Sequence, residues 1–288
     1  MRSVKRERMW YLVYAVAFAA LAIASVVSLI HADELSLGRK PWDNLLRTVS
    51  ELGHPSFLDL WVGPERLAYK DADGNVLRVE NRRQVEASFL RAVAEASWTT
   101  VKIATLGTLA ASIIALPLGV ASARNLHASR WVAYPARGLA DSLRSIHTLV
   151  FGLIFVGIVG LGPVAGIAAI AAHSAGTLAK LYAEAIESLE NAPIEAVRLS
   201  GASRPQLFFL AIWPAVLPQF TSLNLYVLEF NIRDSAVLGL IGAGGLGLLI
   251  SEATSLFQWG RLATLLTALV SLVALADAVS RRIRRRLL

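Results

Sequence analysis

A glycine-rich segment has the spacing of residues that bind a nucleotide. Residues 238–253 read LGLIGAGGLGLLISEA, and Gly242-x-Gly244-x-x-Gly247 follows directly on an apolar run. After a strand, this spacing holds the pyrophosphate of a dinucleotide at the N-terminus of a helix. The acidic residue that would bind the ribose about 20 positions later is missing, because Thr267 stands there in an apolar stretch. An enzyme that binds a dinucleotide at these glycines is therefore only an alternative interpretation.

The favoured interpretation of the same segment is structural. Irregular backbone is tolerated at membrane depth only where it is buried in protein or lines a cavity. Glycines let such backbone pack closely against neighbouring helices. We expect a gate or packing role for Gly242, Gly244, Gly245 and Gly247.

Other chemistry is excluded by the motifs that the sequence lacks. It has no G-x-x-x-x-G-K-[ST] phosphate-binding loop, no H-E-x-x-H and no cysteine, and its five histidines do not have metal-ligand spacing. We therefore expect no catalysis, no metal and no ATP binding by this chain itself.

Polar residues inside apolar stretches are more informative, because a charge at the bilayer centre costs about 2.5–3.5 kcal/mol on insertion scales. His173, Thr177, Lys180 and Glu184 follow spacings of four, three and four, which places them on one helix face. These residues are candidates to line a substrate pathway. Lys180 and Glu184 have an alternative interpretation, because their long side chains can extend to the membrane surface.

A second polar set lies on a later apolar stretch. Asn224, Glu229 and Arg233 are expected near one side of that helix, and Glu229 and Arg233 can form an i,i+4 ion pair. The pair has a purely structural interpretation as well. The complete set predicted to line a substrate pathway is His173, Thr177, Lys180, Asn224, Glu229, Asn231 and Arg233.

The elements that position these residues are membrane spans. Of the 288 residues 55% are hydrophobic and 17% charged, the mean hydropathy is +0.55, and the net charge is +7. The basic residues cluster beside apolar stretches, which favours a membrane protein over a nucleic-acid partner. A hydrocarbon core of about 30 Å needs about 20 helical residues. Six stretches qualify: 10–30, 98–122, 139–161, 163–186, 208–230 and 259–280.

Orientation follows from lysine and arginine, which are enriched on the cytoplasmic side. With six spans, the basic runs at residues 2–8, 124–137 and 281–286 fall on one side, so both termini are expected in the cytoplasm. The first stretch is too long for a signal peptide and lacks a cleavage site. Residues 31–96 then lie outside, with a hairpin that turns at Asp73-Gly74.

One motif lies between the fourth and fifth spans, on the expected cytoplasmic side. The chain reads EAVRLSGAS from Glu195 to Ser203 and reaches Pro214 after Ile212-Trp213. It resembles the E-A-A-x-x-x-G-x(9)-I-x-L-P signature of binding-protein-dependent ABC importer permeases. An ordinary helix-turn-helix is the alternative. The resemblance implies a coupling helix that docks an ATPase, with the coupling residues Glu195, Ala196, Gly201, Ala202, Ser203 and Pro214.

Further segments resemble the phosphonate-type branch of these permeases, which also includes phosphite and hypophosphite importers. They are KLYAEAIE from Lys180, SGASR from Ser200, FNIR from Phe230 and VLGLIGAGGLG from Val237. One departure is His147-Thr148, where Pro-Glu is expected.

The resemblance implies an all-α integral membrane protein with six transmembrane helices, the type I ABC importer permease fold and a cytoplasmic coupling helix. It divides the chain into an N-terminal span with its extracytoplasmic segment, 1–96, and a permease domain, 97–281. The expected location is the bacterial inner membrane, and the chain is expected to be a transport subunit rather than an enzyme.

The resemblance also implies the partners of this subunit. They are a second permease copy in a homodimer, two ATPase subunits that bind ATP and Mg²⁺, and an extracytoplasmic phosphonate-type binding protein. A permease of the same fold for methionine or another small solute, and a membrane scaffold that transports nothing, remain alternatives.

Overall fold

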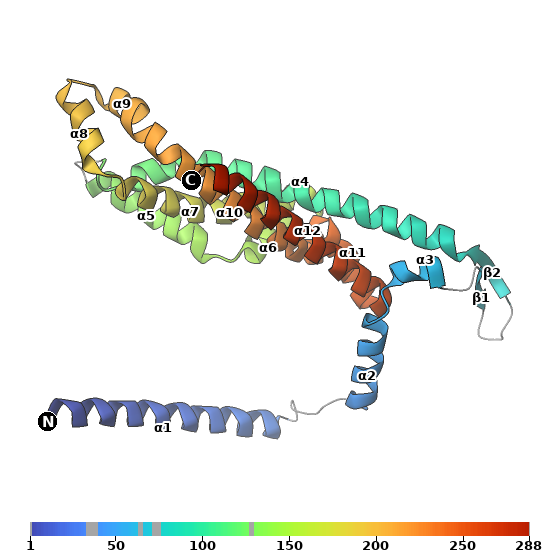
Figure 1. Ribbon diagram of the computed structural model, residues 1–288. Coiled ribbons are helices and arrows are strands. Elements are labelled where there is room, and N and C mark those ends of the chain that lie inside the picture. The colour runs from blue at the N-terminus through green and yellow to red at the C-terminus, as the bar shows by residue number, and fades with distance from the viewer. Residues whose placement is uncertain (1, 33–39, 63–65, 71–75, 127–129, 288) are drawn as a thin grey trace. The chain divides into compact units, whose positions relative to one another are not determined.

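The computed structural model describes residues 2–32, 40–62, 66–70, 76–126 and 130–287. The chain divides into two compact units, residues 1–50 and residues 51–288. Figure 1 shows the elements of both units in order along the chain.

The first unit contains one long apolar helix. α1 spans Arg2–His31, and its part from Met9 to His31 is long and apolar enough to cross a membrane. α2 begins within the same unit and spans Pro41–Leu52. The predicted first span, 10–30, is therefore helical throughout.

The second unit is a helical bundle with a small hairpin. Its elements are η1 (Ser56–Leu58), α3 (Asp59–Val62), β1 (Arg66–Lys70), β2 (Val76–Asn81), α4 (Arg82–Ser122), α5 (Arg130–Ser145), α6 (Thr148–Val159), α7 (Pro163–Glu187), α8 (Asn191–Leu199), α9 (Arg204–Leu207), η2 (Phe208–Ile212), α10 (Trp213–Leu238), η3 (Gly239–Ala243), α11 (Leu246–Ser255) and α12 (Trp259–Leu287).

The predicted hairpin is present as β1 and β2, which pair antiparallel from Arg66↔Asn81 to Lys70↔Val76. Its expected turn at Asp73-Gly74 lies outside the described residues. Asn81 then caps α4, because its side-chain oxygen accepts a hydrogen bond from the Arg83 backbone N–H at 3.0 Å.

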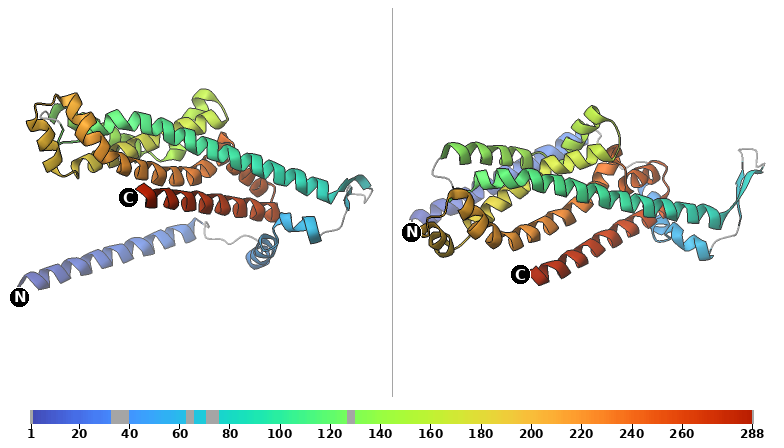
Figure 2. Two further views of the ribbon diagram at one scale, coloured as in Figure 1. Left: turned by 45° about the horizontal axis from the view of Figure 1, so that its top comes forward. Right: turned by 90° about the horizontal axis from the view of Figure 1, so that it is seen from above.

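α4 is longer than a bilayer requires. Its 41 residues extend about 61 Å at 1.5 Å per residue, against a hydrocarbon core of about 30 Å. The predicted span 98–122 forms its second half, and the hairpin lies at its beginning. Figures 1 and 2 show the hairpin at one end of this unit and α8 at the other.

The core of the bundle lies between α4, α7 and α10, which pack side by side (Figure 2). α7 is the most enclosed helix and contributes Leu178, Ala179 and Ile186, all fully buried. Tyr182 is also buried and stacks on Phe220 of α10, with 4.0 Å between ring centroids. Glycines let neighbouring helices approach α7 closely: an added Cβ would lie 2.6 Å from the Ala140 carbonyl oxygen of α5 at Gly176, and 2.6 Å from Ile170 at Gly107 of α4.

The third predicted span, 139–161, is not one straight helix. It breaks between Ser145 and Thr148, where α5 and α6 meet at an angle of 87°. His147 occupies the break with an extended backbone and caps α6 by accepting the Leu149 backbone N–H on Nδ1 at 3.2 Å. Apolar composition did not reveal this cap, so the sequence-based boundaries were wrong here.

Five helices in the described chain are long and apolar enough to cross a membrane, or six when the bent α5–α6 pair counts as one span. The fold is therefore all-α apart from the hairpin. The fourth, fifth and sixth predicted spans correspond to α7, to residues 205–243 and to α12.

Candidate functional site

A short helix, α8, joins the fourth and fifth spans and carries the predicted coupling residues. Gly201 follows it with a φ of 81°, the left-handed conformation in which glycine commonly ends a helix. Ile194 is buried in the apolar core, whereas Glu195 is exposed and Leu199 exposes 88% of its surface. Ile194 therefore anchors α8 in the core, and the outer face carries both charges, Glu195 and Arg198, beside the apolar Leu199.

The segment after α8 is held by local hydrogen bonds. Gln206 Oε1 accepts the backbone N–H and the hydroxyl of Ser203, both at 2.8 Å. Ala202 is half-buried, and Ala196, on α8 itself, is exposed. The predicted coupling residues from 195 to 203 thus form one continuous stretch of surface.

Pro214 acts on the helix that follows. It has no N–H, and a proline ring collides with the carbonyl four residues earlier in a regular α-helix. Here the preceding turns are the π-helix η2, in which the Trp213 N–H bonds the Phe208 carbonyl. This wider turn accommodates the proline as the chain re-enters the bundle.

A second candidate site is a cavity of about 250 Å³ at the α5–α6 break. Its lining is mostly polar or aromatic and comes from the break, α7 and α10: His147, Thr148, His173, Ser174, Thr177, Tyr226, Val227, Phe230, Asn231 and Asp234.

The floor of this cavity is a hydrogen-bonded link between three helices. Asn231 of α10 is 2% exposed; its Nδ2 donates to Thr108 Oγ1 of α4 at 2.8 Å, and its Oδ1 accepts the Ser174 hydroxyl of α7 at 2.9 Å. Both ends of the amide are therefore used. Asn231 fixes the helices around the cavity.

The groups on the other walls keep free hydrogen-bonding capacity. His173 Nδ1 donates to the Ile146 carbonyl at 2.7 Å, which leaves its Nε2 unbonded within the described chain. His147 accepts a backbone N–H on Nδ1, so the proton of its neutral ring is on Nε2. Asp234 Oδ2 accepts the Thr148 hydroxyl at 2.8 Å. Two imidazoles and a carboxylate thus surround one small space.

The predicted pathway residues divide between several places. His173, Thr177 and Asn231 lie together in the cavity. The expected helix face continues toward α8, where Lys180 and Glu184 line a smaller hollow of about 70 Å³ against α5. Lys180 Nζ lies 4.0 Å from Asp141 Oδ1 there.

Asn224 and Glu229 are not on one side of α10, which corrects the sequence-based expectation. Five residues correspond to about 140° of rotation in a helix. Asn224 Nδ2 donates to Tyr182 Oη at 2.6 Å, and its Oδ1 accepts the Ser112 hydroxyl, so it lies in the α4–α7 core.

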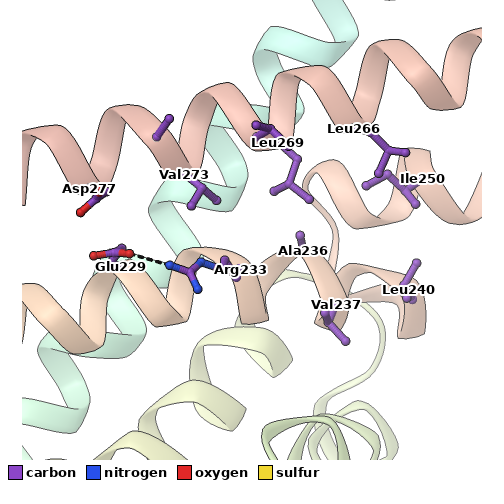
Figure 3. Close-up of a pocket in the computed structure, with 12 residues that line it drawn as sticks. Glu229, Arg233, Ala236, Val237, Leu240, Ile250, Leu266, Leu269, Val273 and Asp277 are labelled. Atoms are coloured by element: carbon purple, nitrogen blue, oxygen red, sulfur yellow. Dashed lines mark hydrogen bonds and ion pairs between the residues drawn. The ribbon is translucent and has the colours of Figure 1, made fainter. Parts of the chain in front are cut away.

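Glu229 and Arg233 instead belong to a groove of about 600 Å³ between α10 and α12. Figure 3 shows both side chains on α10, with Asp277 of α12 nearby and leucine and valine side chains along the rest of the groove. Arg233 Nη2 lies 2.5 Å from Glu229 Oε1, and its guanidinium lies 5.4 Å from the Phe230 ring centre. The predicted pair is formed, away from the cavity.

The glycine-rich segment is not a dinucleotide site. It follows helix α10 and the π-helix η3 rather than a strand, and the described chain contains only a two-stranded antiparallel sheet. Gly242, Gly244 and Gly245 have φ values of 92°, 86° and 69°, so the backbone is irregular as expected. A Cβ on Gly247 would lie 1.8 Å from the Ala236 carbonyl oxygen, so α11 packs directly on the backbone of α10.

Sequence reasoning missed His147, Thr148 and Asp234. The first two stood out as a departure from Pro-Glu, but nothing placed that departure at a cavity. Asp234 follows Asn231 by three residues and therefore shares its helix face. The adjacent Arg233 lies about 200° from Asn231 around α10, so selecting it did not indicate Asp234.

An all-α membrane subunit with an exposed short helix at one end and a polar cavity inside its bundle has the architecture of a transport permease. Residues 115–288, more than half of the chain, match the family described as "binding-protein-dependent transport system inner membrane component". The chain belongs to this family. It is the permease subunit of an ABC importer, and it has no catalytic role of its own.

Several relatives have been named for phosphorus compounds. The chain is 36% identical to the putative phosphite transport permease HtxC of Stutzerimonas stutzeri over 69% of this chain and 71% of the relative. It is 37% identical to the phosphite transport permease PtxC of the same organism, over 65% and 68%. The phosphate-import permease PhnE of Mycolicibacterium smegmatis is 34% identical, over 65% and 35%.

Solved structures agree on the fold. The permease of the methionine transporter MetNI in an inward-facing conformation matches with a TM-score of 0.64 at 24% identity, over 70% of this chain and 98% of that one. An amino acid ABC transporter matches with a TM-score of 0.60 at 15% identity, over 70% and 97%. At these identities the likeness shows the fold alone.

Proposed function

We propose that this permease carries a phosphorus oxyanion, such as phosphonate, phosphite or hypophosphite, across the bacterial inner membrane. The observation that carries the proposal is the set of relatives named for phosphite transport, two of them at 36% and 37% identity. The cavity at the α5–α6 break supports it. A hydrated anion needs hydrogen-bond donors to replace its water, and this cavity supplies the Nε2–H of His147 and the hydroxyl of Thr177.

The proposed assembly contains two copies of this chain, two ATPase subunits and an extracytoplasmic binding protein. One chain offers one α8, whereas two ATPases each need a coupling helix, so a homodimer is the simplest arrangement. ATP and Mg²⁺ bind to the ATPase subunits. The exposed Glu195, Arg198 and Leu199 support docking at α8, because a charged and apolar surface is available there.

The proposed orientation places α8 and both termini in the cytoplasm and the hairpin outside. The hairpin and α8 lie at opposite ends of the second unit (Figure 1), which supports this arrangement. A reporter fused after Arg198 should then be cytoplasmic and one fused after Val79 extracytoplasmic. Reporters on the same side would contradict the proposed topology.

Uptake by the reconstituted transporter tests the substrate. The permease, assembled with its ATPase and its binding protein, should accumulate labelled phosphite or methylphosphonate in vesicles when ATP is supplied. Accumulation of methionine or another solute, with none of any phosphorus oxyanion, would favour the alternative substrate class. ATP hydrolysis by the partner that is independent of this chain would favour a scaffold.

Two variants test the coupling role of α8. Glu195→Lys and Gly201→Asp should insert normally but abolish substrate-stimulated ATP hydrolysis, the first by reversing a surface charge and the second by straining a backbone with a φ of 81°. The exposed Glu252→Gln on α11 is the control and should hydrolyse ATP normally. Normal stimulation in both α8 variants would remove the coupling assignment.

A further inference from the structure

We propose that Asp234 makes the cavity at the α5–α6 break selective for oxyanions that still carry a P–OH group. The inference rests on the proposed function and adds a specificity determinant to it. It follows from the charge and the hydrogen bonds of the groups that face the cavity.

The cavity is not a simple anion site, because it contains a carboxylate. Asp234 lies on its wall together with the two imidazoles. In the described chain no lysine, arginine or histidine forms an ion pair with Asp234. The adjacent Arg233 points to the other face of α10, where it pairs with Glu229. The negative charge of Asp234 thus has no neutralising ion-pair partner among the residues that the structure describes.

Thr148 holds this carboxylate in place. Its hydroxyl donates to Asp234 Oδ2 at 2.8 Å, across the break from α6 to α10. One oxygen of the carboxylate is therefore fixed, and the other keeps its lone pairs for a ligand, since the carboxylate can only accept hydrogen bonds. A ligand that meets this oxygen must bring a donor.

The two imidazoles in the cavity wall offer the remaining contacts to a bound oxyanion. His147 donates through Nε2, because its Nδ1 accepts the Leu149 N–H. His173 has its Nδ1 committed to the Ile146 carbonyl, so Nε2 of the neutral ring can only accept a hydrogen bond. An oxyanion between these groups would place a P–O⁻ oxygen toward the Nε2–H of His147 and another oxygen toward Asp234.

The oxygen that faces Asp234 decides the selectivity between different oxyanions. Two anionic oxygens repel each other, whereas a proton between them makes a short, strong hydrogen bond. The monoanions of phosphite and methylphosphonate have one P–OH each and can donate it to Asp234. The hypophosphite monoanion has two oxygens, two P–H bonds and no P–OH, so it presents either an anionic oxygen or a P–H bond to the carboxylate and no hydrogen-bond donor. Asp234 should therefore disfavour hypophosphite.

The test is the ratio of phosphite to hypophosphite uptake by the complete reconstituted transporter, in one mildly acidic buffer in which phosphite is mainly its monoanion. Asp234→Asn removes the charge, keeps an acceptor for Thr148 and offers an amide donor. We expect this variant to raise hypophosphite uptake relative to phosphite about tenfold compared with the unmodified protein. Selectivity of the binding protein cancels, because the same binding protein serves every variant.

Two further variants separate charge from fold. Thr148→Val breaks the hydrogen bond that positions Asp234 but leaves the carboxylate, so it should change the ratio by less than Asp234→Asn does. Glu252→Gln removes an exposed carboxylate elsewhere and should leave the ratio unchanged. The inference is overturned if Asp234→Asn is folded and active with an unaltered ratio, or if Thr148→Val alone changes the ratio as much. Unmodified protein that transports neither compound would instead overturn the proposed function.

Discussion

The cavity at the α5–α6 break and the groove between α10 and α12 lie on opposite faces of one helix, and their polar groups are arranged in opposite ways. In the groove, Glu229 and Arg233 satisfy each other at 2.5 Å between apolar walls. In the cavity, the side chains of His147, His173 and Asp234 bond to backbone or to a hydroxyl and retain capacity toward the open space.

This difference teaches which polar residues of a membrane helix belong to structure and which to a ligand. A charged side chain that forms an ion pair with a residue four positions away on the same helix needs no ligand to neutralise it. A side chain in a cavity wall that is fixed by one hydrogen bond to the protein still has a free donor or acceptor. Such a side chain can bind a ligand in the cavity. The groove is therefore expected to affect stability and the cavity to affect uptake.

The largest effect should come from the backbone contact beside the groove. Gly247→Ala places a methyl group 1.8 Å from the Ala236 carbonyl oxygen, and neither backbone can move aside easily. We expect a loss of about 3 kcal/mol or more in stability, seen as a lower midpoint of thermal unfolding in detergent. Gly157→Ala on α6 is the control, because nothing lies within 4 Å of its added Cβ. Equal stability of the two variants would show that α11 does not pack tightly on α10.

Loss of the ion pair should have the next largest effect. Arg233→Gln strands Glu229, whose side chain is only 14% exposed, while that of Arg233 is 49% exposed. Because the arginine is half-exposed, we expect a loss of about 2 kcal/mol rather than the full cost of a buried charge. The double variant with Glu229→Gln should recover most of the thermal stability.

Uptake is the second measurement on the same variants. A structural pair predicts that the double variant also recovers transport. A stable double variant that transports poorly would place Arg233 on the substrate route and break the contrast between the two faces of α10.

His173 should give the converse result. His173→Asn keeps a donor near Nδ1 for the Ile146 carbonyl and removes the cavity-facing Nε2. We expect phosphite uptake to fall about tenfold, as for the loss of a hydrogen bond to a charged group, with unfolding temperature unchanged. His173→Leu removes both and should reduce uptake and stability together. Full uptake by the asparagine variant would exclude His173 from the route.

Much of the fold could be predicted from the sequence, because apolar length and basic flanks are strong signals. α1, α7 and α12 lie close to their expected ranges. The break between α5 and α6 could not be predicted, since it depends on the capping of Leu149 by His147 and on the tether from His173 to Ile146. Both are contacts between side chains and backbone, which the hydropathy of the sequence does not indicate.

The candidate site was predictable only in part for a similar reason. Helical spacing correctly placed His173 and Thr177 on one face. Nothing in spacing alone indicated that the α5–α6 break would bring Thr148 to Asp234, 86 residues away in sequence. The roles of the coupling residues and of the pathway residues stay predictions until variants are measured.

The smallest effect is expected at Thr177, where the cavity ends toward Lys180. Thr177→Val keeps the shape and removes one hydroxyl, so a passing oxyanion would lose a single neutral hydrogen bond. We expect the KM for uptake to rise about threefold with no change in maximal rate or stability, because the hydroxyl binds the ion only in passing. Thr267→Val on α12 is the matched control, since its hydroxyl donates to the Ala263 carbonyl of its own helix. If both variants behave alike, the α7 face below His173 is not part of the route. The contrast with the groove would then rest on the histidines and Asp234 alone.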